Sequence, residues 1–271
     1  MINSTTGDPI AQLLARLSKK EERRGSKPRC HLLTHGSPAY VAMRLTSLVA
    51  PFAEISANHA WMPVGFDNLT EAQLHNAPRL LEGRNSDALH NWWLVRKGNA
   101  KTPHIDIAST CTIEGRPGLL LVEAKAHDEE LIQECAGKRL DEHASAGSAA
   151  NHERIGIAIA EACTGLAAAT KLVWQISRDS HYQMSNRFAW SWKLTELGVP
   201  VILVYLGFLN ADEMVDRGKP FQGHRDWEAL VKAQSTQLFP ASVWGQPWRA
   251  NGQAFVPLIK SFELALDHEV V

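Results

Sequence analysis

The stretch PHIDIASTCTIEGRPGLLLVEAKAH, residues 103–127, contains two apolar runs that read as neighbouring β-strands. Three charged residues interrupt these runs: Asp106 in the first, and Glu123 and Lys125 in the second. Two carboxylates and an ammonium group are costly to bury in a sheet unless they are paired or have a function. The stretch therefore predicts a pair of core strands and a candidate functional site where they meet.

The loop between the two strands decides whether the three charges share one face of the sheet. Glu123 and Lys125 point the same way because side chains alternate along a strand. If the loop is Glu114–Gly115, Asp106 lies opposite Glu123. If it is residues 114–117, Asp106 faces Lys125, with Glu123 diagonal to it. A three- or five-residue loop would separate the charges unless a bulge restored the register, so loop length tests the site.

Converging carboxylates suit hard divalent cations, Mg²⁺ or Mn²⁺. Asp106 and Glu123 would be the ligands, and the main-chain carbonyl of Ala124 is a further one. Lys125 would then orient or deprotonate the attacking water, or offset charge that develops on a phosphoryl oxygen. The alternative is a structural salt bridge of Lys125 with Glu123 or Asp106.

The residues PHID followed by LLLVEAKAH resemble the P-D…(D/E)-x-K signature of the PD-(D/E)xK nuclease superfamily. This superfamily includes restriction endonucleases, recombination and repair exonucleases, and resolvases. The resemblance covers roughly residues 91–208. It implies that Asp106 and Glu123 bind the metal and that Lys125 is the catalytic lysine. The chain departs from the signature at Pro103, which does not immediately precede the aspartate.

The resemblance extends to the sequence YQMSNRFAW further along the chain. In some branches of the superfamily, a helix after the E-x-K strand brings a glutamine towards the metal, and here this implies Gln183. Arg187 lies one turn later on the same helical face, where a tyrosine might be expected. The alternative is a helix start with polar residues in solvent. Some members also use an acid from an earlier helix, for which Glu71 and Glu82 are the candidates.

The order of strand, strand, helix and buried strand predicts a mixed α/β fold with helices packed over a central sheet. The resemblance implies a restriction-endonuclease-like core. We expect three regions: an N-terminal helical extension (1–60), the nuclease-like core (61–210) and a C-terminal helical and loop region packed on the core (211–271).

Individual elements are predicted from capping and periodicity. We expect helices from Asp8 to near Gly25, over 38–56 with a break at Pro51, over 70–83, over much of 128–170 with a loop at 145–151, and over 179–198. We expect strands over 88–98, 172–177 and 199–208 in addition to the opening pair.

Composition narrows the functional classes. The 271 residues are 45% hydrophobic and carry a formal net charge of -1, so contacts with DNA require a local basic patch. Residues 16–29 contain seven basic and two acidic residues, which indicates either a phosphate-binding arm or a solvated helix end. The four cysteines are scattered and predict reduced thiols. No secretory signal or membrane-spanning run is present, so we expect a soluble, cytoplasmic protein.

Other motifs are weaker. His143 and His152 lack zinc-site spacing, and His127 is expected at the surface. The tryptophans are expected mainly in the core. The sequence lacks a phosphate-binding P-loop, a dinucleotide fingerprint and a nucleophile elbow. The predicted function is a Mg²⁺-dependent nuclease acting on DNA. The alternative is a non-catalytic nucleic-acid-binding or scaffold protein on the same fold. RNA as substrate, endo- or exonuclease action, and a homodimer remain open.

Overall fold

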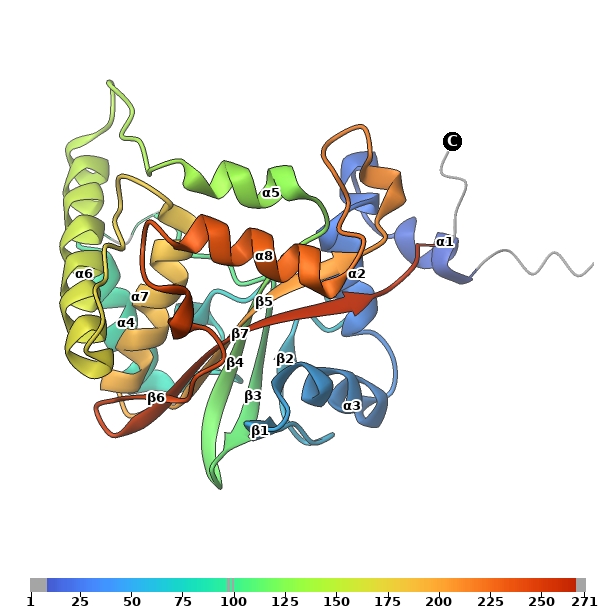
Figure 1. Ribbon diagram of the computed structural model, residues 1–271, viewed down its shortest axis with the longest axis horizontal. Coiled ribbons are helices and arrows are strands. Elements are labelled where there is room, and N and C mark those ends of the chain that lie inside the picture. Colours follow the sequence, from blue (N-terminus) through green and yellow to red (C-terminus); the bar gives the residue numbers. More distant parts are fainter. Residues whose placement is uncertain (1–8, 97, 99, 267–271) are drawn as a thin grey trace, which may run out of the picture.

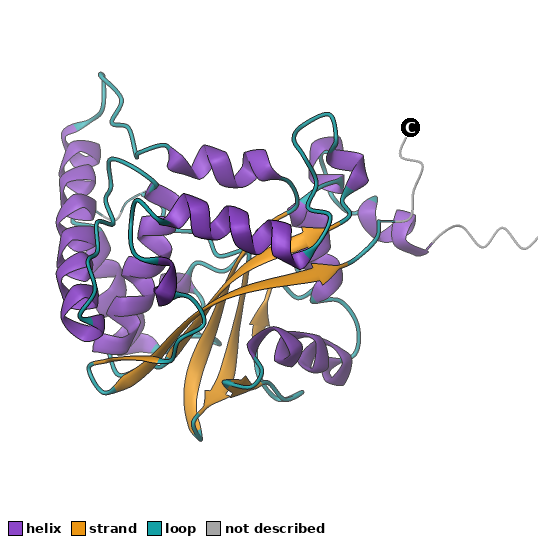
Figure 2. Cartoon of the chain, in the orientation of Figure 1, coloured by secondary structure: helices purple, strands orange, loops and turns teal. Residues whose placement is uncertain are grey.

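A mixed, seven-stranded β-sheet lies at the centre of the computed structural model, which describes residues 9–96, 98 and 100–266 (Figures 1 and 2). The strand order is β1-β3-β4-β5-β7-β6, and the short β2 also pairs with β3. The strands β4, β5 and β7 are mutually parallel, whereas β3 and β6 run antiparallel to their neighbours. The strands are β1 (Ala53–Glu54), β2 (Trp61–Met62), β3 (Ile107–Ile113), β4 (Arg116–Lys125), β5 (Val201–Leu209), β6 (Trp248–Ala250) and β7 (Gln253–Glu263).

The hairpin of β3 and β4 has the two-residue loop. Ile113 pairs with Arg116, and Glu114 and Gly115 both have positive φ, 51° and 74°. Positive φ at both central positions is typical of a type I′ turn, which matches the twist of the two strands. The register continues to Ile107 opposite Val122, so one further step places Asp106 opposite Glu123.

Most helices cover one face of the sheet, where α4, α6 and α7 stack on the left of Figure 1 and α5 and α8 lie in its upper part. The largest core cluster fills this layer and includes Trp93, Trp190 and Phe188, each fully buried. Trp92 and Trp192 are also buried, which agrees with the expected core role of the tryptophans. The helices are α4 (Gly83–Trp93), α5 (Asp128–Ile132), α6 (Ala146–Thr170), α7 (Tyr182–Glu196) and α8 (His224–Ser235).

The opposite face of the sheet is covered by the N-terminal helices. The second core cluster joins α2 and α3 to Leu120, Val122 and Ala124 of β4. A small third cluster packs α1 against α2 and Phe66. These helices are α1 (Pro9–Leu14), α2 (Ser26–Leu33) and α3 (Pro38–Val49), and the short 3₁₀ turns are η1 (Lys20–Arg23), η2 (Leu74–Asn76), η3 (Gln133–Cys135), η4 (Asp212–Met214) and η5 (Ala241–Val243).

Several predicted elements are present. The two core strands, the helix α7 and the continuously buried strand β5 lie where the sequence predicts them. Helix α3 ends at Val49, just before Pro51, and Gly198 follows α7 with a φ of 83°. The four cysteines are free thiols. None of the helices in the described part of the chain has the length and hydrophobicity needed to cross a bilayer.

Other elements differ from the prediction. The expected strand 88–98 belongs largely to helix α4, and the expected helix 70–83 is reduced to the turn η2. The run 172–177 forms no strand, and most of 145–151 begins helix α6 instead of forming a loop. The first helix ends at Leu14, well before Gly25, while its predicted cap Asp8 lies outside the described residues.

The C-terminal region contributes directly to the central sheet. The prediction of helices and loops for 211–271 is wrong for β7, which pairs with β5 along nine residue positions from Val201 to Leu209. From the N-terminal region, β1 pairs with β3 at the opposite edge. The sheet is therefore built from all three predicted regions of the chain.

Candidate active site

The predicted site residues converge on the sheet face that α7 covers. Glu123 and Lys125 lie at the end of β4, and Asp106 directly precedes β3. Glu123 is fully buried and Lys125 is 6% exposed, whereas Asp106 is half-buried. Leu119 and Leu121 lie on the same face of β4 and belong to the core cluster that includes α7. The alternation of the strand therefore directs the charges beneath this helix.

Glu123 is the centre of the site. Its Oε1 accepts hydrogen bonds from the Lys125 ammonium and, at 2.5 Å, from Nε2 of Gln183. Its Oε2 accepts from Nε of Arg187 at 2.6 Å. A second guanidinium nitrogen of Arg187 donates to the carbonyl of His104 at 2.6 Å. The first two turns of α7 thus bring Gln183 and Arg187 to the glutamate, and Arg187 also ties this helix to the chain entering β3.

Asp106 approaches the cluster from the neighbouring strand. Its Oδ2 accepts a hydrogen bond of 2.7 Å from the backbone N–H of Ala124, between Glu123 and Lys125. Among the described residues, its Oδ1 has no hydrogen-bond donor, and the side chain lines an open pocket. One oxygen therefore holds the aspartate on β4, and the other is available to a ligand.

Glu134 is a further member of the cluster that the sequence analysis did not identify. Its Oε1 lies 2.8 Å from the Lys125 ammonium, and its Oε2 accepts a hydrogen bond of 3.4 Å from the Tyr205 hydroxyl. It belongs to η3 and is 4% exposed. No motif marks this glutamate, because its approach to Lys125 depends on how η3 packs beside the sheet.

The cluster contains more negative than positive groups. Three carboxyl groups, those of Asp106, Glu123 and Glu134, face two permanent cations, Lys125 and Arg187. Burial and the charge of Glu123 raise the pKa of Asp106 to about 8. Burial also raises the pKa of Glu134 to about 7, against the influence of Lys125. One carboxyl therefore lacks a compensating charge, and a proton or another cation is needed to balance it.

The charged forms of Glu123, Lys125 and Arg187 stabilise one another. Burial alone would raise the pKa of Glu123, but Arg187 and Lys125 lower it below its ordinary value. Burial would lower the pKa of Lys125, but Glu123, Glu134 and Asp106 together raise it. The pKa of Arg187 is raised in the same way by Glu123 and Asp106. Lys125 is therefore an ammonium ion throughout the physiological pH range.

The two candidate upstream acids lie in different places. Glu71 lines the same pocket as Asp106, and its carboxylate is 3.4 Å from Nδ1 of His104. Glu82 occupies the N-cap position of α4 and does not line this pocket. Of the two, only Glu71 faces the site.

An open pocket of about 410 Å³ leads from the surface to this cluster. Residues 101–104 and Asp106, on the chain entering β3, form part of its wall, and Glu71, Lys138 and the start of α7 form the rest. Asp106, Gln183 and Arg187 all line it. A ligand in the pocket would therefore meet the free oxygen of Asp106 beside the polar groups of α7.

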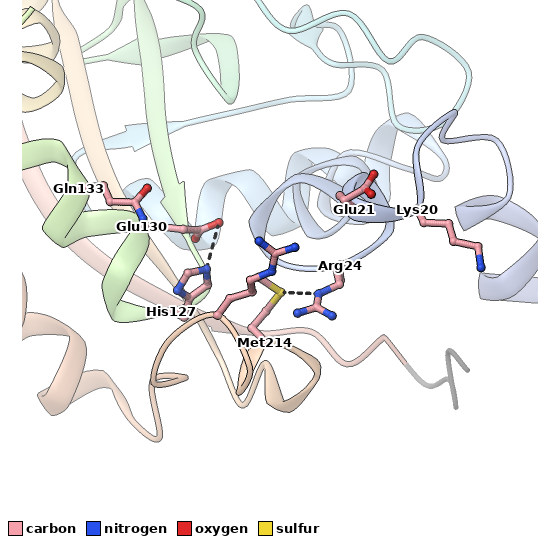
Figure 3. A pocket seen from close by; sticks show the side chains of 8 residues that line it. Lys20, Glu21, Arg24, His127, Glu130, Gln133 and Met214 are labelled. Atoms are coloured by element: carbon pink, nitrogen blue, oxygen red, sulfur yellow. Dashed lines mark hydrogen bonds and ion pairs between the residues drawn. The ribbon is translucent and has the colours of Figure 1, made fainter.

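A second pocket, of about 570 Å³, lies near His127 just beyond β4 (Figure 3). His127 is 6% exposed, so the prediction that it is a surface residue is wrong. His127 forms an isolated β-bridge with Pro220. Gly218 lies so close to the imidazole ring that a Cβ on it would be 2.4 Å from Nδ1. The other ring nitrogen is 3.9 Å from the carboxylate of Glu130. The strap 218–220 therefore covers the ring.

The basic run 16–29 contributes Lys20 and Arg24 to this second pocket. Arg24 is ion-paired with Asp216, and its Nε contacts the sulfur of Met214 at 3.3 Å (Figure 3). Four cations of the run are held by carboxylates, in the pairs Arg16–Asp67, Arg24–Asp216, Lys27–Glu22 and Arg29–Glu213. Three of these pairs attach the run to the rest of the protein, whereas Lys27–Glu22 lies within the run.

Comparison with known proteins identifies no relative: no family model, curated protein or solved structure matches the chain. Within the described residues, no group of three or more His, Cys, Asp or Glu side chains is arranged to hold a metal ion. A metal at this site would accordingly use Asp106 and Glu123 with backbone or water oxygens. The site must be interpreted from its own chemistry.

Proposed function

We propose that this protein is a divalent-metal-dependent nuclease that hydrolyses phosphodiester bonds in DNA, on a restriction-endonuclease-like core. The observation that carries the proposal is the uncompensated carboxyl group beside an open pocket. Asp106 directly precedes β3, Glu123 lies opposite it on β4, and the local charge requires a proton or one more cation. A purely structural ion-pair cluster has no need of this excess.

The donor set fits Mg²⁺ or Mn²⁺. Asp106 offers a free carboxylate oxygen at the pocket, Glu123 lies across the hairpin from it, and the carbonyl of Ala124 is a third oxygen on the connecting backbone. Hard cations of this kind favour carboxylate, carbonyl and water oxygens. A bound ion would supply Lewis-acid activation of the phosphodiester and of water. Asp106 must give up its proton for such an ion to bind, because its pKa is about 8.

Lys125 acts in this proposal as a fixed positive charge. Its ammonium lies between Glu123 and Glu134, which together raise its pKa. A lysine that keeps its proton cannot accept one from water. It can orient the attacking water and offset the negative charge that develops on a phosphoryl oxygen. Of the roles considered for Lys125 from the sequence, this disfavours deprotonating the water and keeps the other two.

Gln183 and Arg187 position Glu123. Both donate to its carboxylate, one to each oxygen. A glutamate held from two sides keeps one orientation, and such preorganisation is what a catalytic site requires. Neither side chain can take up a proton, so both act by hydrogen bonding and charge alone.

A non-catalytic nucleic-acid-binding or scaffold protein is the alternative, and one observation favours it. Both oxygens of Glu123 are already engaged by Lys125, Gln183 and Arg187. In that reading the cluster is an ion-pair network, and Asp106 is simply protonated at neutral pH. The two functions differ in whether the protein binds a divalent ion.

A cleavage assay tests the proposal. Wild type and the variants Asp106→Asn and Glu123→Gln would be incubated with single- and double-stranded DNA and RNA, with Mg²⁺, with Mn²⁺ or with chelator. We expect cleavage by the wild type only with metal, and at least a hundredfold loss in each variant, by analogy with the loss of a single transition-state contact, about 10²–10³. Lys193→Gln, in a partly exposed pair with Glu196 near the C-terminal end of α7, is the matched control. Metal-independent cleavage, or full activity in both variants, would refute the site.

A further inference from the structure

Lys138 is a cation at the junction of two pockets. It lines the pocket that contains Asp106, and it also lines a neighbouring pocket of about 400 Å³. The second pocket is formed largely by residues 138–144 and the beginning of α6. Lys101 is the other residue shared by both. The two hollows therefore meet at this pair of lysines, next to the candidate active site.

The ammonium of Lys138 has no carboxylate partner in the described part of the chain. The ion pairs of this region join Glu71 to His104, and Glu123 to Lys125 and Arg187. The contact that Lys138 does make is with the ring of Tyr182, 5.1 Å from its centroid. Burial lowers the pKa of Lys138. A partly dehydrated cation without a counter-ion favours an anion supplied from outside.

The backbone around Lys138 is held on both sides. Its N–H donates to the carbonyl of Arg178 at 2.8 Å, and its own carbonyl accepts from Nε2 of His152 at 2.8 Å. Gly137 packs so closely against Asp179 that a Cβ would lie 2.1 Å from the carbonyl oxygen. A side chain at residue 137 would push Lys138 away from this position.

The same segment is joined to the start of α7. The N–H of Tyr182 donates to the carbonyl of Ala136 at 3.1 Å, and Ser180 forms a β-bridge with Ala136. Gln183 follows directly in α7 and bonds to Glu123. Hydrogen bonds between residues 136–138 and 178–182 therefore fix Lys138 relative to Gln183.

We propose that Lys138 binds a backbone phosphate of a nucleic-acid strand that passes from the Asp106 pocket across the Lys101–Lys138 junction. The nature of the anion rests on the proposed nuclease function. Lys101 and Arg139 line the onward path, and the acid there, Asp141, is engaged by the backbone N–H of His143 at 2.8 Å. Lysine ammonium groups bind phosphate as point charges, without reading the base sequence.

Oligonucleotide binding to the full-length protein in chelator, where metal-dependent cleavage cannot occur, tests the inference. Fluorescence anisotropy with labelled single- and double-stranded DNA would be measured between about 50 and 200 mM salt. We expect Lys138→Gln to weaken binding about tenfold, the value of one charge-assisted contact. A plot of log K, where K is the association constant, against log salt concentration has a negative slope. Its magnitude should decrease by about 0.7 for single strands or about 0.9 for duplex.

Two variants control for folding and for total charge. Lys138→Arg should retain the affinity and the salt slope. Lys171→Gln removes an exposed lysine at the far end of α6 and should leave both unchanged. Equal melting temperatures would show that Lys138→Gln folds. A competition arm with inorganic phosphate distinguishes a strand from a free anion: phosphate binding that needs Lys138, without oligonucleotide binding, would overturn the proposed strand.

The outcomes separate this inference from the nuclease proposal. If wild type binds and cleaves DNA but Lys138→Gln binds equally well with the same slope, the role of Lys138 is refuted and the nuclease stands. If Lys138→Gln loses affinity but wild type never cleaves with metal, Lys138 remains a phosphate ligand on a binding protein. If wild type binds no nucleic acid, both proposals fail.

Discussion

Arg187 allows the protein to bury Glu123 as a carboxylate. The guanidinium bonds to Oε2 of Glu123, to the carbonyl of His104 and to the side chain of Asn186 at 2.8 Å, while the arginine is only 4% exposed. Removing one partner of a buried pair leaves the other charge uncompensated, which is more destabilising than losing both. Arg187 and Glu123 should therefore be energetically coupled.

A double-mutant cycle measures this coupling. We expect Arg187→Met to lower the free energy of unfolding by about 3–5 kcal/mol. Combining it with Glu123→Gln should restore much of the loss, because the stranded charge is gone. Urea unfolding at pH 7 in chelator gives the four values. Additive effects of the two substitutions would show that the pair is not coupled.

Asp106 should make the stability of the metal-free protein depend on pH. Its pKa is raised to about 8 in the folded protein, from an ordinary value of 3.8. The folded state then binds the proton more tightly than the unfolded state, so stability is highest at low pH and is lost as the pH rises from about 4 to 8. Asparagine cannot titrate, and its amide oxygen can still accept from the N–H of Ala124.

Asp106→Asn should therefore gain stability relative to wild type as the pH rises. We expect a gain on the order of 1–2 kcal/mol at pH 8, less than the full linkage value because the half-buried carboxyl is screened by water. The gain should disappear near pH 4. Urea unfolding of both proteins across this pH range measures the difference in their free energies of unfolding. Glu134 titrates in both proteins, so its contribution to this difference largely cancels. A constant difference at all pH values would contradict the raised pKa.

At the residue scale, much of the site follows from strand geometry. Alternation along β4 and the parity of an even loop suffice to bring Asp106 to the face of Glu123 and Lys125. Helical periodicity adds Gln183 and Arg187 to one face of α7. Glu134 and Lys138 could not be found this way, because each reaches the site through the packing of an irregular segment, which no local period describes.

At the scale of elements, the contact between α6 and α7 determines where the site helix lies. Gly165 of α6 faces Trp192 of α7, and a Cβ at this glycine would lie 2.2 Å from the indole ring. The close approach allows α6 to lie flat on α7, the helix that carries Gln183. Glycine is intrinsically unfavourable within a helix, so its presence here reflects packing.

Gly165→Ala should consequently destabilise the protein although alanine is the better helix former. We expect a loss of about 1–3 kcal/mol from overpacking against the indole. Gly147→Ala is the matched control on the same helix, since the nearest atom to its Cβ is 3.7 Å away. The control should be neutral or slightly stabilising. Thermal or urea unfolding compares the two, and a stabilised Gly165→Ala would show that Trp192 moves aside easily.

The elements that were predicted correctly each have one clear pattern of apolar residues. The core hairpin, α7 and β5 each show a single pattern over their length. The run 88–98 was mistaken for a strand because of its aromatic residues, although Leu89, Trp92 and Trp93 have helical spacing and are buried in α4. Pro78 interrupts 70–83, leaving only the turn η2. Short apolar runs such as 172–177 cannot be assigned from periodicity alone.

At the scale of the whole molecule, the sheet is completed by the last strand of the chain. Pro257 lies within β7 and pairs in register with Leu203 of β5. Proline lacks a backbone N–H and usually argues against an inner strand, which is why the sequence favoured loops here. The short β6 covers only the beginning of β7, because Trp248–Ala250 pair with its first residues, Gln253 to Phe255. The pairing of β7 with β5 joins distant parts of the chain, so it has no local signal in the sequence.

Metal binding should stabilise the whole molecule, because the donor oxygens are brought together only in the folded sheet. Asp106 directly precedes β3, Glu123 lies in β4, and the cations that hold Glu123 in place include Arg187 from α7. A ligand that binds the folded state alone stabilises it by mass action, by about 2.7 kcal/mol at 100 times its dissociation constant. For a chain of this size, the melting temperature should rise by about 2–4 °C for each kcal/mol.

Melting curves of wild type and Asp106→Ala, each with Mg²⁺, with Mn²⁺ or with chelator, separate the metal site from a structural cluster. Wild type should melt higher with metal, and the gain should increase from pH 6.5 to 8.5 as Asp106 loses its proton. Asp106→Ala should gain nothing from metal, yet in chelator at pH 8.5 it should melt at or slightly above wild type, because removing one of three ionised carboxyls relieves repulsion. A structural cluster predicts a different result: metal has no effect on wild type, and the variant melts below wild type in every buffer because the buried N–H of Ala124 loses its acceptor.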